Sequence, residues 1–454
     1  MEQMKRTATC GQLRKTDAGK TVVLNGWVHR KRDHGGVSFI NLRDRYGLTQ
    51  AVVEPGAEAA LGAAAYAALA GTAAELRNEY CIALEGLVRE RPGSMVNPGM
   101  PTGAVEVAAR KIVILNRCEV LPFQIEDETH AGEELRLRYR YLDLRSQAMQ
   151  DRLRLRSEAA FTVREWMTGQ GFYEIETPTF VKSTPEGARD YLVPSRLYPG
   201  KFYALPQSPQ LYKQILMAAG FDKYFQIARC YRDEDARGDR QPEFTQIDIE
   251  MSFVSRDDVL SMTEGLMGRV FKKCLGADLP ARFIRLSYEE ALERYGSDKP
   301  DLRYGLELQD FGPYVAAGGF QAFKDALAQG EAAQAAARAR GLSIAGGGVK
   351  ALVVPAGLMG AAPYSRKQIE ELEATAKIYQ ARGLAWIKLV AVDGNIALEG
   401  GVAKFFTDQA DAIASGLGAG PGDLILIVAD SRRKTANLAL GAVRSKLGRD
   451  LGLT

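Results

Sequence analysis

Two apolar-rich segments flanking a strongly charged loop constrain the middle of this chain more than any other feature. The segments are residues 224–231 and 244–253, and the loop between them is residues 232–241. In the second segment apolar residues largely alternate with polar ones, a period-two pattern that is typical of a β-strand. The sequence therefore predicts an antiparallel hairpin with a long polar loop.

Polar side chains at the ends of this hairpin suit a bound ligand. Arg232 and Glu234 stand two positions apart at a strand end, so we expect their side chains on one face. An arginine offers a planar fork to a phosphate or carboxylate, and a glutamate accepts a hydrogen bond from an amine. Gln246, Asp248 and Glu250 are expected along one face of the return strand. A buried polar row is costly unless it meets a polar ligand, although an exposed hairpin would carry the same residue types.

The wording of the hairpin, RDEDARGDRQPEFTQID, resembles the second signature motif of class II aminoacyl-tRNA synthetases, in the form found in bacterial aspartyl-tRNA synthetases. This resemblance implies that Arg232 is the catalytic residue, holding both the α-phosphate of ATP and the carboxylate of the amino acid. It also implies that Asp233, Glu234 and Gln241 bind ATP. ATP would then be a substrate, with Mg²⁺ on its phosphates.

Length and composition fit a large globular protein. A chain of 454 residues is expected to hold about three domains. The net charge of +3 permits nucleic-acid binding without requiring it. Five scattered cysteines predict reduced thiols, and the three histidines are not spaced as metal ligands, so we predict no protein metal site. No apolar stretch is long enough to span a bilayer and the N-terminus has no apolar signal core, which predicts a cytoplasmic protein without membrane contact.

Residues 1–116 have the pattern of a small Greek-key barrel of the OB type. The predicted elements are strands at 21–29, 37–42, 48–53, 80–88 and 105–115, with a helix at 58–76. A basic run followed by Phe39 suits phosphate binding combined with base stacking. An ordinary exposed basic turn, with Phe39 in the core, fits this pattern equally well.

The same stretch, GWVHRKRDHGGVSFINLRDRYGLTQAVVEP, resembles the anticodon-binding domain of the aspartyl family. The resemblance implies four anticodon contacts, from Arg32, Phe39, Gln50 and Glu106. Phe39 would stack on a base, and Gln50 and Glu106 would bond to base edges, as is usual for single-stranded RNA. His34 and Gly93 resemble the subgroup that charges both tRNA(Asp) and tRNA(Asn), although both could be neutral loop residues.

A charged hinge is expected at residues 117–150, followed by the first part of a catalytic domain at 151–304. Asp151 is expected to begin an amphipathic helix, and a strand ending at Pro178 follows. A helix, a strand and a closing proline match the first class II signature, which builds the dimer interface in this family and so implies a homodimer.

The segment between this strand and the hairpin is expected to form the amino-acid pocket. Small polar residues at 183–190 suit a mobile lid, and Ser208–Pro209 predicts a helix with Ser208 as N-cap. Gln210 and Lys213 share a helix face, which by spacing alone could be surface charge. TPEGARD and QSPQLYKQ, however, resemble the lid and aspartate pocket of the aspartyl family. The aspartate-binding set that this implies is Glu186, Ser208, Gln210, Lys213, Arg232, Gln246 and Asp248.

In that set, Glu186 would take the α-amino group and Lys213 the side-chain carboxylate, with Gln210 in support.

From residue 305 onward alanine and glycine dominate, and strands alternate with helices. Strands are expected at 351–355, 386–392 and 424–429, and helices at 365–382 and 435–447. This pattern predicts a separate α+β insertion at 305–454 that resembles the GAD domain of bacterial aspartyl synthetases.

We therefore predict a multidomain α+β enzyme that attaches aspartate to tRNA(Asp), and also to tRNA(Asn), through an aspartyl-adenylate. The chain reaches LGRDLGLT without the third class II signature, so we expect a C-terminally truncated enzyme with an incomplete catalytic domain. A fragment that only binds anticodons is an alternative from another class. An asparaginyl- or lysyl-tRNA synthetase is the alternative within the class, and the GAD-like region and TPEGARD disfavour both.

Overall fold

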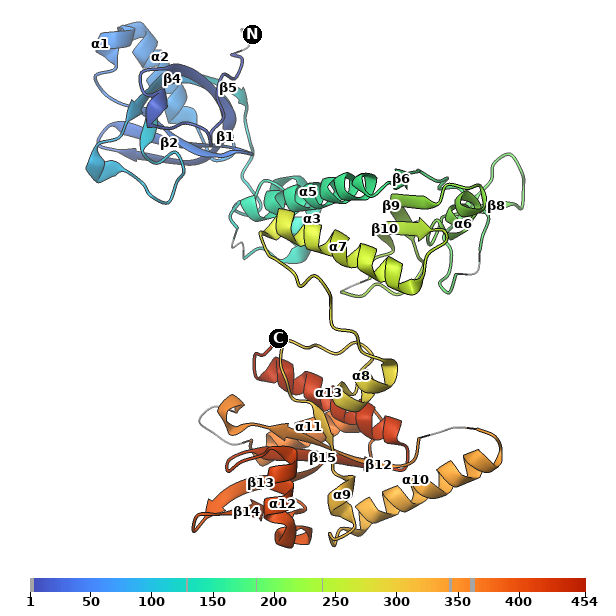
Figure 1. Ribbon diagram of the computed structural model, residues 1–454. Helices are drawn as coiled ribbons and strands as arrows, with labels where there is room; N and C mark the ends of the chain where they lie inside the picture. Colours follow the sequence, from blue (N-terminus) through green and yellow to red (C-terminus); the bar gives the residue numbers. More distant parts are fainter. Residues whose placement is uncertain (1–3, 128–129, 185, 239, 343–344, 360–363) are drawn as a thin grey trace. The chain divides into compact units, whose positions relative to one another are not determined.

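The computed structural model describes residues 4–127, 130–184, 186–238, 240–342, 345–359 and 364–454. These residues form two compact units, 1–282 and 283–454 (Figure 1). The expected α+β class, with an N-terminal OB-fold barrel and a synthetase-type catalytic region, is confirmed.

Five strands of the first unit close into a barrel in the order β1-β2-β3-β5-β4. Their bounds are β1 (Thr21–His34), β2 (Val37–Asp44), β3 (Gly47–Val53), β4 (Cys81–Glu90) and β5 (Val105–Asn116). Alternate residues such as Leu24, Ile40 and Leu84 are fully buried and form the barrel core. The single helix predicted at 58–76 is two helices, α1 (Glu58–Leu61) and α2 (Ala63–Glu75), because Gly62 between them has a positive φ of 85°.

The rest of the first unit contains a three-stranded sheet in the order β10-β9-β6 and a two-stranded sheet of β7 and β8, together with helices. The elements are α3 (Glu133–Arg138), α4 (Arg140–Asp143), α5 (Gln147–Gly169), β6 (Tyr173–Glu174), β7 (Leu192–Pro194), β8 (Phe202–Ala204), α6 (Gln210–Ala218), β9 (Lys223–Tyr231), β10 (Glu243–Met251) and α7 (Arg256–Leu275). Strands β9 and β10 pair antiparallel with Ile227 opposite Ile247, which confirms the predicted hairpin.

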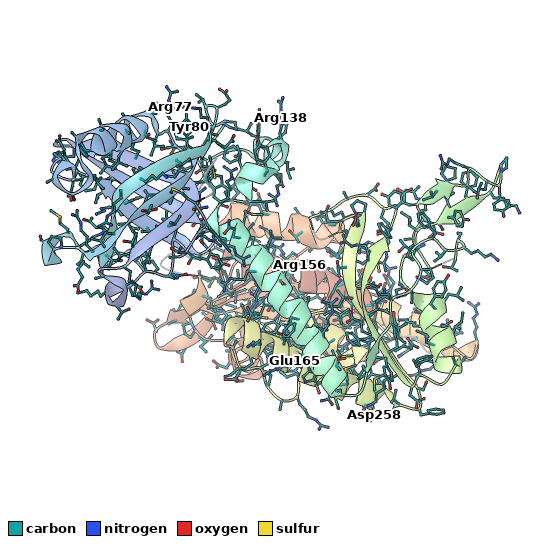
Figure 2. The ribbon with its side chains drawn as sticks, turned by 90° about the horizontal axis from the view of Figure 1, so that it is seen from above. Arg77, Tyr80, Arg138, Arg156, Glu165 and Asp258 are labelled. Atoms are coloured by element: carbon teal, nitrogen blue, oxygen red, sulfur yellow. The ribbon has the colours of Figure 1, made fainter. Side chains whose placement is uncertain are left out.

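Strand β10 separates the core of this region from its polar face. Ile249 and Met251 pack into an apolar cluster with residues of α5 and α7. Successive strand residues point to opposite faces, so Asp248 and Glu250 face the other side, where α6 lies. On the core side, Arg156 of α5 (Figure 2) donates to the Thr245 hydroxyl at 2.7 Å.

Two predicted helix starts are wrong. Helix α5 begins at Gln147, ahead of Asp151, because Ser146 already takes the extended conformation of an N-cap. Helix α6 begins at Gln210 with Pro209 as its N-cap, so Ser208 is not the cap. The Ser208 hydroxyl instead donates to the Glu186 carboxylate at 2.7 Å.

The second unit is a five-stranded antiparallel sheet in the order β11-β12-β15-β13-β14, with helices on both faces. Its elements are α8 (Tyr288–Tyr295), β11 (Leu308–Asp310), α9 (Gly312–Val315), α10 (Gln321–Ala339), β12 (Gly348–Val354), α11 (Arg366–Ile378), β13 (Ala385–Val392), β14 (Asn395–Glu399), α12 (Ala410–Leu417), β15 (Leu424–Asp430) and α13 (Arg433–Asp450). The strands expected at 351–355, 386–392 and 424–429 correspond to β12, β13 and β15. Helix α11 ends before the predicted residue 382.

Residues 283–304 belong to this second unit, although the sequence assigned them to the catalytic region. Arg444 of α13 is 1% exposed, and its guanidinium donates to the backbone carbonyls of Asp301, Tyr304, Gly305 and Leu306. Glu293 of α8 accepts hydrogen bonds from Arg433, at 2.7–2.9 Å. These bonds attach the segment to α13.

In the described part of the chain, no helix is long and apolar enough to cross a membrane.

Candidate active site and barrel groove

Lys213 is the centre of a charged cluster between α6 and β10. Its Nζ lies 2.9 Å from Asp248 Oδ1 and 3.3 Å from Glu250 Oε2, and its side chain is 12% exposed. Burial alone would lower the pKa of this ammonium, but the two carboxylates more than offset that effect, and the pKa is raised. Helix α6 therefore presents a permanent cation to the polar face of the sheet. Sequence analysis did not assign Glu250 to the site, although the alternation of β10 placed it on this face.

Glu186 is held over the start of α6 by two hydroxyls. Thr184 Oγ1 donates to Glu186 Oε1 at 3.2 Å, and Ser208 Oγ donates to Oε2 at 2.7 Å. The expected lid, 183–190, is described except for residue 185. A carboxylate fixed in this way is suited to accept from an amine.

Gln207 connects this lid to the body of the site, a role that sequence analysis missed. The side chain is 3% exposed. Its Nε2 donates to the Ala188 carbonyl at 2.8 Å and to the Asp190 carboxylate, while Oε1 accepts from the Ala188 amide at 3.1 Å. The only sequence signal was its position directly before Ser208.

Cys230 marks where the charged groups converge. Burial and the Asp248 carboxylate raise the pKa of its thiol to about 11, against the opposing effect of Arg232 and Lys213, and the Glu186 carboxylate adds to the rise. The pKa of the buried Cys230 thiol is thus affected by charged residues of the lid, of α6 and of the hairpin.

The two predicted glutamines differ in their surroundings. Gln246 Oε1 accepts from Cys230 Sγ at 3.3 Å, so this amide lies beside the convergence point. Gln210 is the first residue of α6 and is half-buried, one turn before Lys213. All seven residues predicted to bind aspartate therefore come from the lid, α6 and its preceding turn, or the hairpin.

A cavity of about 280 Å³ at the hairpin loop contains three of the four residues predicted to bind ATP: Arg232, Glu234 and Gln241. The Arg232 guanidinium lies over the Phe244 ring, with Cζ 5.0 Å from the ring centroid. Arg232 Nε is buried and makes no hydrogen bond to any described residue. An unpaired buried donor is costly, so it is expected to meet a ligand.

Asp233 lines an adjoining cavity of about 340 Å³, together with Glu234 and lid residues. The Asp233 amide donates to the Arg189 carbonyl at 2.9 Å, and Arg189 Nε donates back to the Asp233 carbonyl at 3.3 Å. The lid and the hairpin loop therefore form one continuous wall. Glu234 is paired across the loop with Arg240 at 3.6 Å.

A groove of about 490 Å³ on the barrel contains four predicted tRNA-binding residues: Arg32, His34, Phe39 and Gln50. Phe39 is half-buried and lines this groove, which favours the ligand-facing interpretation over the core one. Gly93 lies in a short 3₁₀ helix, Gly93–Met95, is exposed and does not line the groove.

Glu106 is 7% exposed and is hydrogen-bonded to Gln50. Its Oε2 accepts from Gln50 Nε2 at 3.1 Å, and its Oε1 accepts from Arg89 Nε at 2.9 Å. The other end of the Arg89 guanidinium binds Glu54, with Nη2 to Oε2 at 2.9 Å. Sequence analysis missed Arg89 and Glu54, because they are far apart in sequence and look like surface charge until the order of the barrel strands is known.

The described residues contain no group of three or more His, Cys, Asp or Glu side chains arranged to hold a metal ion. Two acidic side chains, Glu234 and Asp235, do line the cavity beside Arg232. Carboxylate oxygens are the protein ligands that Mg²⁺ prefers, usually alongside substrate phosphates.

Comparison with known families agrees with this geometry. Residues 132–427 match the model of class II tRNA synthetases (D, K and N), and residues 22–115 match that of the OB-fold nucleic acid binding domain. The chain belongs to the class II tRNA synthetases.

Individual relatives narrow the comparison. Over 453 residues the chain is 62% identical to the aspartate–tRNA(Asp/Asn) ligase of Treponema denticola, covering 100% of this chain and 72% of that protein. It is 52% identical to the aspartate–tRNA(Asp/Asn) ligase of Treponema pallidum (strain Nichols), covering 99% and 70%. A solved asparaginyl-tRNA synthetase from Pyrococcus horikoshii, complexed with asparaginyl-adenylate, matches 97% of both chains with a TM-score of 0.52 and 18% identity, which shows a shared fold.

Proposed function

We propose that this protein attaches L-aspartate to tRNA(Asp), and also to tRNA(Asn), through an aspartyl-adenylate formed with ATP. The observation that carries the proposal is the buried Lys213 ammonium, held between Asp248 and Glu250 on the face where Arg232 and Glu186 also converge. The two Treponema relatives are named for this activity.

Charge selects the amino acid. Lys213 binds the side-chain carboxylate of aspartate, and Glu186 accepts from its α-ammonium, oriented by the Ser208 hydroxyl. Gln210, Gln246 and Asp248 complete the wall. Asparagine has the same shape but a neutral amide, so its contact with the Lys213 ammonium would lack the charge of the aspartate carboxylate and would be weaker.

Arg232 joins the two substrates. Its planar guanidinium can bond to the α-phosphate of ATP and to the α-carboxylate of aspartate together. A carboxylate oxygen attacks the α-phosphorus, the bond to the pyrophosphate oxygen breaks, and pyrophosphate leaves with the electron pair. Catalysis then consists of positioning and charge stabilisation, with no side-chain nucleophile.

The hairpin loop holds the nucleotide. Glu234 accepts from the adenine amine, Gln241 and Asp233 line the surrounding walls, and the Phe244 ring lies beside the Arg232 guanidinium. Mg²⁺, bound with the phosphates near Glu234 and Asp235, would supply neutralisation of their negative charge.

The barrel groove reads the anticodon. Phe39 stacks on one base, Arg32 meets phosphate, and Gln50 and Glu106 bond to base edges. The Glu106–Arg89 bond holds these edge-reading groups in place. His34, in the same groove, and Gly93 allow both tRNAs to be accepted.

The remaining parts of the proposal concern assembly. We propose a cytoplasmic homodimer formed through α5 and β6, where Phe161 and Tyr173 are each 63% exposed. Residues 117–150 would act as the hinge after the barrel. We also propose that the second unit is a GAD-type insertion, beginning near residue 283 where the compact unit starts.

The direct test is aspartate-dependent exchange of pyrophosphate into ATP by the 454-residue chain, with asparagine as control. Exchange with aspartate alone is expected. Exchange with asparagine alone would point to an asparaginyl enzyme instead. No exchange, with retained binding of an anticodon stem-loop of tRNA(Asp), would reduce the protein to an anticodon-binding role.

A further inference from the structure

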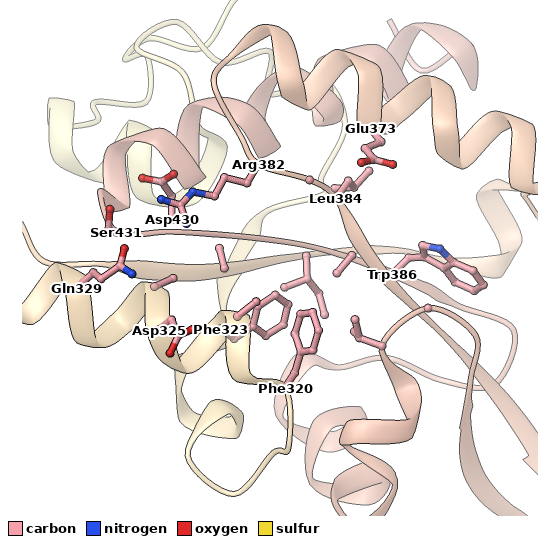
Figure 3. Close-up of a pocket in the computed structure, with 18 residues that line it drawn as sticks. Phe320, Phe323, Asp325, Gln329, Glu373, Arg382, Leu384, Trp386, Asp430 and Ser431 are labelled. Atoms are coloured by element: carbon pink, nitrogen blue, oxygen red, sulfur yellow. The ribbon is translucent and has the colours of Figure 1, made fainter.

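A cavity of about 490 Å³ in the second unit takes no part in the proposed aminoacylation (Figure 3). It lies between one face of α10, the start of β13 and the end of β15. Strands β13 and β15 pair only from Ala385 opposite Ile427 onward, so β15 continues to Asp430 past the beginning of β13. Its size is in the range of small-molecule sites.

One end of the cavity is apolar. Phe320 and Phe323 form an edge-to-face pair with ring centroids 4.7 Å apart. Leu384 and Ile427 are buried in the adjoining wall, at 7% and 0% exposure. The helix face opposite contributes small residues, including Ala326, which leaves room between α10 and the sheet.

Trp386 lines the cavity at the start of β13, but its side chain packs with the apolar cluster on the opposite face of the sheet from Phe320 and Phe323. Its ring is held in place by a glycine pair. A Cβ on Gly400 would lie 1.9 Å from the Trp386 ring, and one on Gly401 would lie 2.0 Å from the Trp386 carbonyl oxygen. Both glycines have positive φ, 75° and 44°, so side chains are excluded on conformation as well as space. The indole is therefore held in one position beside the cavity, where its resonance can report on a bound ligand.

The other end is polar and carries both signs of charge. Figure 3 shows Arg382, Asp430, Ser431 and Gln329 at this end, opposite the aromatic rings. Arg382 is exposed and forms no hydrogen bond or ion pair with any described residue.

The carboxylates around the cavity do have partners. Glu373 pairs with Lys377 at 2.7 Å, and Asp430 accepts from the Arg432 amide at 2.8 Å. Among the described residues, Asp325 accepts only an uncharged hydrogen bond, from Gln321 at 2.7 Å. Among the described residues, Arg382 thus has no protein partner, Asp325 has no cationic partner, and Asp430 pairs with Arg432 at 3.7 Å. These groups together match a head group that carries one positive and one negative charge.

We propose that this cavity binds an α-amino acid with an apolar side chain. The carboxylate would bond to the Arg382 guanidinium, and the ammonium would be bound by Asp325 and Asp430. The side chain would lie against Phe320 and Phe323. A ligand with only a negative charge would be repelled by the carboxylates, and a ligand with only a positive charge would form no ion pair with Arg382.

Fluorine NMR of the full chain labelled with 5-fluorotryptophan tests the proposal. The chain has three tryptophans, Trp27, Trp166 and Trp386, so three resonances can be assigned with Trp→Phe variants. L-Phenylalanine or L-leucine should shift the Trp386 resonance saturably. L-Aspartate, 3-phenylpropionate and phenethylamine should bind at least about tenfold more weakly, because each lacks the apolar body or one of the two charges.

Two variants and their matched controls locate the effect. Arg382→Gln should weaken L-phenylalanine binding at least about tenfold, whereas Arg340→Gln, at an exposed arginine outside the cavity, should not. Ala326→Leu should fill the cavity and abolish the shift, whereas Ala328→Leu, on an exposed face of the same helix, should leave it intact. Absence of a saturable Trp386 shift with either amino acid would overturn the proposal. So would equal binding of phenethylamine, or an Arg382→Gln variant that binds as tightly as the parent.

Discussion

The Lys213 ammonium and the Asp248 carboxylate are in direct contact across the polar face of the hairpin, with Nζ 2.9 Å from Oδ1. The pair is only 12% and 8% exposed, so water screens it poorly. This contact places a cation of fixed position where the aspartate side chain is proposed to bind, and its removal gives the first prediction.

Lys213→Met should lower kcat/KM for aspartate in pyrophosphate exchange by at least about 100-fold, equivalent to about 2.7 kcal/mol. The substrate carboxylate would then face Asp248 and Glu250 without a compensating cation. Lys273→Met, at an exposed lysine of α7, is the matched control and should leave exchange unchanged. Exchange within about threefold of the parent in Lys213→Met would contradict the assignment.

Gln207→Ala should loosen the lid. Its two hydrogen bonds with the backbone of Ala188 would be lost, so exchange of the Ala188 amide hydrogen should become faster. The KM for aspartate should rise by about tenfold, with less effect on the exchange rate at saturation. Gln214→Ala, at an exposed position of α6, serves as the control. Unchanged protection of Ala188 would show that the lid is held by other contacts.

Phe39→Ala should weaken binding of the tRNA(Asp) anticodon stem-loop by about 1–3 kcal/mol, the usual contribution of one base stacked on an aromatic ring. Amino-acid activation should be unaffected, since it uses the hairpin and α6. Tyr46→Ala, which removes a 53% exposed aromatic ring outside the groove, should bind normally. Fluorescence anisotropy of a labelled stem-loop measures both, and equal losses in the two variants would point to a general effect on the barrel.

Glu293 should make the second unit sensitive to acid. Burial alone would raise the pKa of this carboxyl, but hydrogen bonds from Arg433 and Asn437 and the charge of Lys350 lower it to about 2. A depressed folded-state pKa stabilises the protein above the unfolded value of about 4.5, and that stability is lost as the pH falls toward about 2.

The matching variant is Glu293→Gln, which should lose about 1–2 kcal/mol at neutral pH and show a smaller further loss on acidification. The figure is modest because the carboxylate is 37% exposed and partly screened. Hydrogen exchange of β12 amides across pH 2–6 reports the second unit alone. Parallel pH profiles for parent and variant would show that Glu293 is not the sensitive group.

The sequence was most informative where pattern and motif coincided. Alternation predicted both strands of the hairpin, and the barrel strands were predicted to within a few residues at most ends. Arg232, Glu234 and Lys213 could be chosen because their motifs are long. The site residues that were missed, Gln207 and Arg89, act through partners far away in sequence, so no local pattern indicates them.

Boundaries were less predictable, for physical reasons. Ser208 has the chemistry of an N-cap, but the carboxylate of Glu186 competes for its hydroxyl and the helix begins later. Residues 283–304 were assigned to the catalytic region, because the alanine- and glycine-rich composition begins only at about residue 305. Their assignment to the second unit depends on the buried Arg444, whose carbonyl partners lie about 140 positions away in the chain.

The two-sided character of β10 has a consequence for how this protein can change during evolution. Asp248 faces the proposed substrate pocket, and its neighbour Ile249 packs into the core. Inserting or deleting a single residue in this strand would exchange the two sides, placing charge in the core and aliphatic carbon in the pocket. Folding and substrate choice would fail together, so the strand can accept substitutions but not changes of length.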